Sequence, residues 1–388
     1  MPNPEQPIQE NLADIKEPSK QTEGGLEIAK TEASERVVKT ADQIHNAMEA
    51  NEPVYKKTVD ELREALSKLE YNFYGEKMTL QEIKEIQEQN KEAWEMITTG
   101  RNFNVWLLNR ILTFLTPDVA KRLVERMKPN QNSLLYLDSL KSISTKVAQE
   151  LIKHEGPLYL DGVEEMSLDV LKSLCQKEHK TGLSLGLKSI SKEQAEVIKN
   201  YKGPISLTKL TEMDSASAHE LGELQGYSLR LGLESLPPDV AQELANFKSD
   251  ESNSYKKLSF ISLQYISPES AQKFDSYVQE LNFVTMEKID LETAKGFRNF
   301  SGTLEFGDFI EFDDETAKAL SESDADLGLN ILKEISLQAL RYFASRQKKV
   351  YLTGLEAENL TPEHLRIIAN SENIVVDNEI KELAAKHK

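Results

Sequence analysis

The chain has 388 residues, 39% of them hydrophobic, which is enough to build a substantial core. Its 65 acidic and 47 basic residues give a formal charge of −18, which argues against nucleic acid or an anionic membrane as the main partner, because both bind basic patches. Cys175 is the single cysteine, so no intramolecular disulfide can form. The sequence shows neither a signal peptide nor an apolar stretch approaching ~20 residues, and a cytoplasmic location is therefore expected.

Residues 1–52 are polar, acid-leaning and rich in Gln, Glu, Lys and Pro. A segment of this kind has too little apolar surface to offset the entropy lost on ordering, so we expect a disordered arm.

Residues 53–104 are expected to form a helical hairpin that caps the domain after them. In the first part, apolar residues recur at three- and four-residue steps, as on one helix face: Val59, Leu62, Leu66, Leu69 and Phe73. The stretch from Thr79 to Glu82 matches a capping box and predicts the start of a second helix, which the apolar pattern continues to Ile97.

From about residue 105 the sequence repeats. Each copy opens with an L-x-L pattern, as in LYLDGVEEMS at 158 or LNFVTMEKID at 281, and leads to an anchor residue before a short helix. The anchors are mostly 23 or 24 residues apart: Ser144, Ser167, Ser191, Asp214, Ser267, Asp290, Asp313 and Ser336. The larger interval from Asp214 to Ser267 holds one more copy, anchored at Pro237, and a polar insertion. This period predicts a solenoid over residues 105–388.

Each repeat reads as one strand followed by one helix, which we call a rung. The L-x-L alternation gives a short strand with one buried face, and the Ser, Thr or Asp anchor suits a helix N-cap. An alanine about four residues after the anchor, such as Ala148 or Ala294, lets the helix lie close to the strands. Stacked rungs predict an α/β solenoid with parallel strands on one side and helices on the other.

The repeat resembles the degenerate leucine-rich repeats of bacteria over about residues 105–378. The resemblance implies a protein-recognition scaffold that works without enzymatic chemistry. One position departs from the family, whose strand is followed by Asn or Cys in a side-chain ladder. Here that position is apolar, as at Leu140, Leu187 and Leu332, so the turn geometry is expected to differ.

Two motifs suggest chemistry, and both have a structural explanation. The stretch GLSLGLKSIS at 182 looks like a phosphate loop, but its glycine spacing is wrong and Leu183, Leu185 and Leu187 occupy repeat positions. Cys175 and His179 are a possible thiol–imidazole pair, yet Cys175 ends a repeat helix, where a free cysteine is commonly a small buried hydrophobe. We expect no catalytic residue, no cofactor and no metal site.

The residue between the two apolar residues of each strand should point away from the core, onto the face that solenoids use for binding. The candidates for protein binding are Tyr136, Asp138, Tyr159, Asp161, Arg230, Asn282, Glu305 and Tyr351. The same face should include Ser184, Ser206, Ser259, Gly328, Thr208, Thr353 and Asp377. Tyr136 and Tyr159 should stack on adjacent rungs. Tyrosine is enriched at interfaces, although stacked tyrosines can equally serve to stabilise a sheet.

The favoured function is recognition of a protein or peptide through the strand face. The first alternative is a structural protein that self-associates through the solenoid ends or its helical face. The last is an enzyme or effector with a concealed catalytic function, for which the sequence offers no spare domain.

Overall fold

The computed structural model describes residues 27–28, 70–73, 76–79, 85, 88–93, 112–127, 133–176, 181–247, 256–277, 279–307 and 311–388. The chain divides into two units, residues 1–103 with 111–122, and residues 104–110 with 123–388. Helix α6 (Pro117–Met127) contains the boundary between them. Among the described residues, no helix has both the length and the apolar character to cross a bilayer.

The first unit contains a small antiparallel sheet of order β1-β2-β3. Its strands are β1 (Glu27–Ile28), β2 (Glu70–Phe73) and β3 (Glu76–Thr79). One prediction is corrected here: β2 is a strand where the first helix is expected to end. β1 comes from the expected arm, whose disorder stays a prediction. Aromatic residues alternate with polar ones in β2, a pattern that favours a strand. The remaining residues of that helix and of the arm lie outside the described ranges.

Residues 88–93, in the second expected helix, are helical. Asn90 is buried there; its Nδ2 donates to the carbonyl oxygen of Phe114 at 3.1 Å, and its Oδ1 accepts from the backbone N–H of Thr116 at 2.9 Å. These bonds tie the helix to the segment that precedes α6. The cap role of residues 53–104 stays a prediction.

The second unit contains a parallel sheet in which consecutive strands are neighbours, from β4 to β14. The described part has eleven strands: β4 (Leu135–Tyr136), β5 (Leu158–Leu160), β6 (Leu183–Leu185), β7 (Ile205–Leu207), β8 (Ser228–Leu231), β9 (Lys257–Phe260), β10 (Glu280–Phe283), β11 (Thr303–Phe306), β12 (Asp326–Gly328), β13 (Val350–Tyr351) and β14 (Ile374–Val375). The α/β solenoid architecture predicted from the period is confirmed.

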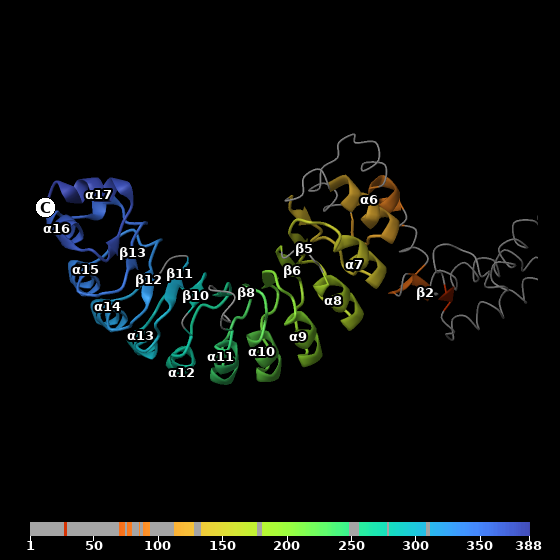
Figure 1. Ribbon diagram of the computed structural model, residues 1–388, viewed down its shortest axis with the longest axis horizontal. Coiled ribbons are helices and arrows are strands. Elements are labelled where there is room, and N and C mark those ends of the chain that lie inside the picture. Colours follow the sequence, from red (N-terminus) through yellow and green to blue (C-terminus); the bar gives the residue numbers. More distant parts are fainter. Residues whose placement is uncertain are drawn as a thin grey trace, which may run out of the picture. The chain divides into compact units, whose positions relative to one another are not determined.

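One helix follows each strand, and Figure 1 shows these helices side by side along the outer side of an arc of strands. They are α7 (Thr145–Leu151), α8 (Leu168–Cys175), α9 (Lys192–Ile198), α10 (Ser215–Gly222), α11 (Pro238–Leu244), α12 (Pro268–Gln272), α13 (Leu291–Gly296), α14 (Asp314–Ser321), α15 (Leu337–Ala344), α16 (Pro362–Asn370) and α17 (Asn378–Ala385), with a 3₁₀ turn η2 (Ala357–Asn359) before α16. A helix is wider than the ~4.8 Å spacing of strands, which accounts for the helices lying on the outside of the curve.

The predicted anchor residues cap these helices. At each Ser, Thr or Asp anchor, the side-chain oxygen accepts a hydrogen bond from the backbone N–H three residues later, as Ser144 does from Val147 and Asp214 from Ser217. Pro237 supplies no such bond. The repeating alanines, Ala148 and Ala294 among them, are fully buried against the strand layer.

A second set of polar bonds joins several rungs to the one before, close to the helix N-terminus. The third helical residue reaches back to the carbonyl oxygen of the residue just before the preceding anchor. The described residues include five examples, with donor and acceptor atoms 2.7–3.2 Å apart: Gln194 to Met166, Ser217 to Ile190, Ser270 to Leu236, Thr293 to Ile266 and His364 to Ile335. These polar contacts lie beside the helix N-termini, whereas the position just after each strand is apolar.

Rungs also approach closely just after the strands. A Cβ placed on Gly162 would lie 1.9 Å from the carbonyl oxygen of Asp138, and one on Gly186 would lie 2.2 Å from that of Asp161. No larger side chain fits at either place unless the neighbouring rung moves.

Candidate functional site

The central strand positions form one uninterrupted row across the sheet, which we call the central row. Strand pairing places each member opposite the next: Tyr136, Tyr159, Ser184, Ser206, Arg230, Ser259, Asn282, Glu305, Gly328 and Tyr351. The leucines on either side, such as Leu158 and Leu160, are fully buried. The alternation of the strands therefore presents the central row on the face away from the helices.

Tyr136 and Tyr159 stack at the N-terminal end of the central row. Their ring centroids are 4.4 Å apart and the ring planes differ by 23°. Tyr136 remains 37% exposed. Burial and the neighbouring Tyr136 raise the pKa of the Tyr159 phenol, so the Tyr159 hydroxyl stays protonated at neutral pH. The pair presents an aromatic surface with polar tips.

Asp138 and Asp161 lie just beyond these tyrosines, and each carboxylate accepts a hydrogen bond from the rung that follows its own. The backbone N–H of Asp161 donates to Asp138 Oδ1 at 3.2 Å, and Asp161 Oδ1 accepts from Ser184 Oγ at 2.6 Å. Burial, followed by the charge of Asp161, raises the pKa of Asp138 even though that backbone hydrogen bond opposes the shift. Both carboxylates are half-buried. Their hydrogen bonds join successive turns, and their negative charge lies at this end of the strand face.

A charged cluster occupies the middle of the face. Asn282 Nδ2 donates to Glu305 Oε2 at 2.9 Å, and Lys257 contacts Glu280 while its Nζ lies 3.5 Å from Glu305 Oε2. Glu280 is only 5% exposed. Burial and the charge of Glu305 raise the pKa of Glu280 to about 7.

Glu280 and Lys257 are absent from the residues predicted for this face. Each lies two residues before a member of the central row, and the two-residue period of a strand gives both the same outward direction. Extending the alternation one step upstream of L-x-L identifies them.

Some of the other predicted residues are exposed, and others are engaged in hydrogen bonds within the chain. Arg230 is exposed, and no hydrogen bond or ion pair links its guanidinium to the described part of the chain. Tyr351 is half-exposed at the far end of the central row. Thr353 donates to Asn330 Oδ1 at 2.9 Å, whereas Asp377 caps α17 by accepting from the N–H of Ile380. Asp377 is thus engaged by a helix, which the strand pattern alone did not reveal.

The stretch GLSLGLKSIS is one rung of the sheet. Its backbone N–H groups are used: Gly186 donates to the carbonyl oxygen of Leu160, and Lys188 donates to that of Glu164. The Lys188 ammonium also pairs with the Glu164 carboxylate at 2.7 Å. A phosphate loop needs N–H groups free to face its ligand, and here they are engaged.

Cys175 is poorly suited to nucleophilic chemistry because burial raises the pKa of its thiol to about 12. His179 lies outside the described residues. Among the residues that the structure describes, no cluster of three or more His, Cys, Asp or Glu side chains is placed to hold a metal ion.

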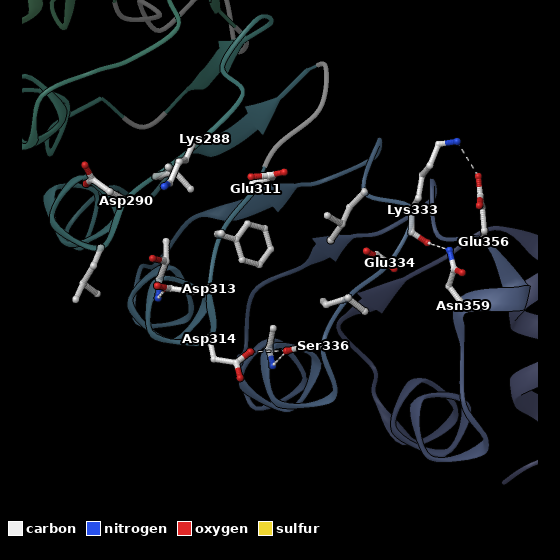
Figure 2. A pocket seen from close by; sticks show the side chains of 17 residues that line it. Lys288, Asp290, Glu311, Asp313, Asp314, Lys333, Glu334, Ser336, Glu356 and Asn359 are labelled. Carbon is white, nitrogen blue, oxygen red and sulfur yellow. Dashed lines mark hydrogen bonds and ion pairs between the residues drawn. The ribbon is translucent and has the colours of Figure 1, made fainter.

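A cavity of about 1070 Å³ opens between the strand-to-helix connections of three successive rungs, at residues 288–291, 311–316 and 332–336 (Figure 2). Lys333 Nζ and Glu356 Oε1 pair at 2.9 Å on its border, and this carboxylate raises the pKa of Lys333. Ser336 donates to Asp314, and both residues line the cavity. No sequence pattern indicates this cavity, because the cavity depends on how far apart neighbouring connections lie.

No protein-family model matches the chain, and no curated protein matches it.

Proposed function

We propose that the protein is a non-enzymatic recognition scaffold that binds a protein or peptide through the strand face of its solenoid. The observation that carries the proposal is the central row, an unbroken line of outward positions that begins with a partly exposed tyrosine stack. Large aromatic side chains give contact area at a low cost in side-chain entropy, which is why they dominate many interfaces.

The composition of the central row also supports recognition. Its ends carry tyrosines, and between them small residues, Ser184, Ser206 and Gly328, alternate with the longer Arg230 and Glu305. Ser184 is only 4% exposed, whereas Arg230 and Glu305 offer two opposite charges to orient a partner. The resemblance to bacterial leucine-rich repeats agrees with this function, and we extend the proposal to a bacterial, cytoplasmic protein.

Sheet stabilisation is the competing explanation of the tyrosine stack, and mutagenesis separates the two. The doubly substituted Tyr136→Ala/Tyr159→Ala chain would be used as bait in native cell extract, with cross-linking and quantitative mass spectrometry. A matched control replaces Tyr227 and Tyr265, which are 41% and 53% exposed and lie outside the central row.

We expect one or more partners to be lost from the Tyr136/Tyr159 variant and kept by the control. Unchanged recovery of every partner, from a variant whose thermal unfolding shows it to be folded, would rule out this patch as the binding site. Light scattering over a range of concentrations tests the self-assembly alternative, which a strict monomer would contradict.

A further inference from the structure

The cavity of Figure 2 lies where the apolar layer beneath the strand-to-helix connections opens. Elsewhere this layer is closed: at the post-strand position Leu140, Leu263 and Leu355 are at most 3% exposed. Leu332, at the same position in its own rung, is only half-buried. Phe312 is likewise half-buried, although its ring still packs edge-on against Phe343 with centroids 6.0 Å apart. The cavity therefore has an apolar floor.

The rim of the cavity is acidic, and several of its carboxylates already have partners. Asp290 and Asp313 cap helices α13 and α14, and Glu356 is paired with Lys333. Glu311 and Glu334 differ: both are exposed, and neither carboxylate has a hydrogen bond or ion pair with the described residues. They come from successive rungs that border the same space (Figure 2).

Two lysines are among the described residues that line the cavity, Lys333 and Lys288, and Lys288 pairs with Glu311 in a parallel β-bridge of the backbone. The charge of Lys288 helps to lower the pKa of Asp313, behind the hydrogen bonds that Asp313 accepts from Thr316. The described lining holds more carboxylates than ammonium groups, so negative charge remains for a ligand: Asp290, Glu311, Asp313, Asp314, Glu334 and Glu356 against Lys288 and Lys333.

We propose that this cavity binds a basic, partly apolar segment of another protein: an arginine or lysine side chain between Glu311 and Glu334, with a neighbouring aliphatic or aromatic side chain on Phe312 and Leu332. The volume, at the upper end of ~300–1,000 Å³ for ligand sites, exceeds what a single cation fills. The apolar floor favours a peptide side chain over a hydrated ion. A second copy of the chain is a poor occupant, because each copy carries a formal charge of −18.

The test uses the full chain with methyl groups of Ile and Leu labelled with ¹³C. The probe is acetyl-Leu-Arg-Phe-amide, and its matched analogue carries citrulline, which is neutral and nearly isosteric with arginine. We expect the arginine peptide to shift the methyl signals of Ile289, Leu332 and Ile335, and the citrulline peptide to bind about tenfold more weakly, as the loss of two charge pairs would predict.

The variant Glu311→Gln/Glu334→Gln should also weaken the arginine peptide about tenfold. The control Glu269→Gln/Glu382→Gln removes the same charge from exposed sites outside the cavity and should change affinity by less than about twofold. The proposal is overturned if the methyl signals do not respond, if citrulline binds as well as arginine, or if the two variants bind alike. Equal binding of spermidine would also overturn it, since charge alone would then suffice.

Discussion

Replacing Phe283 with alanine should destabilise the solenoid more than any surface change. Phe283 is fully buried on β10, and its ring lies in a column with Phe260 at 5.5 Å and Phe306 at 6.1 Å, beside Phe297 at 5.9 Å. Truncating a buried phenylalanine usually costs ~3–5 kcal/mol. The three ring contacts, worth ~0.5–1.5 kcal/mol each beyond burial, place the expected loss in the upper half of that range.

The loss should appear as a lower midpoint in urea unfolding followed by circular dichroism. Phe283→Leu keeps most of the volume and should cost only about 1–2 kcal/mol. Tyr265→Ala, at an exposed turn, should stay within about 0.5 kcal/mol of the parent. A loss below about 1 kcal/mol for Phe283→Ala would show that the phenylalanine column does not hold adjacent rungs together, and would refute the reasoning.

Two further predictions concern a pH dependence and a close approach. Because the pKa of Glu280 is raised to about 7 in the folded chain, the folded state holds this proton more tightly than the unfolded state, and stability should fall as the pH rises from 5 to 8. Glu280→Gln should remove that dependence, matching the parent at pH 5 and exceeding its unfolding free energy at pH 8; parallel urea curves would contradict this. Gly162→Ala should cost more than about 1 kcal/mol, since its Cβ would meet the Asp138 carbonyl. Gly182→Ala, whose Cβ would meet only Pro157 Cβ at 3.6 Å, serves as the control in thermal unfolding, and equal melting temperatures would contradict the steric argument.

The sequence predicted those features of the fold that repeat locally. Periodic spacing with L-x-L alternation was sufficient to place the strands, and the anchors such as Ser144 and Asp214 were sufficient to place the helix starts. Each of these depends on residues only a few positions apart. The prediction failed at Glu70–Phe73, where Tyr71 and Phe73 alternate with polar residues as in a strand, and the segment pairs with β3.

The bonds between rungs were beyond such reasoning. Ser217, Thr293 and His364 share one place in their helices but differ in chemistry, and their acceptors lie 27–29 residues earlier. Only the stacked structure shows which carbonyl oxygen faces each side chain. For the candidate site, the alternation predicted the central row, whereas the engagement of Asp161 by Ser184 and the burial of Glu280 depend on neighbouring rungs.

The contacts between successive rungs set how the two proposed sites influence each other. Five strand spacings of ~4.8 Å, or about 24 Å, separate Tyr159 on β5 from β10, whose rung is the first to line the cavity. In a stack held by nearest-neighbour contacts, a local disturbance must cross each interface in turn and weakens on the way. The strand face and the cavity should therefore have a coupling free energy close to zero, so that each can be occupied, altered or lost while the other keeps its affinity.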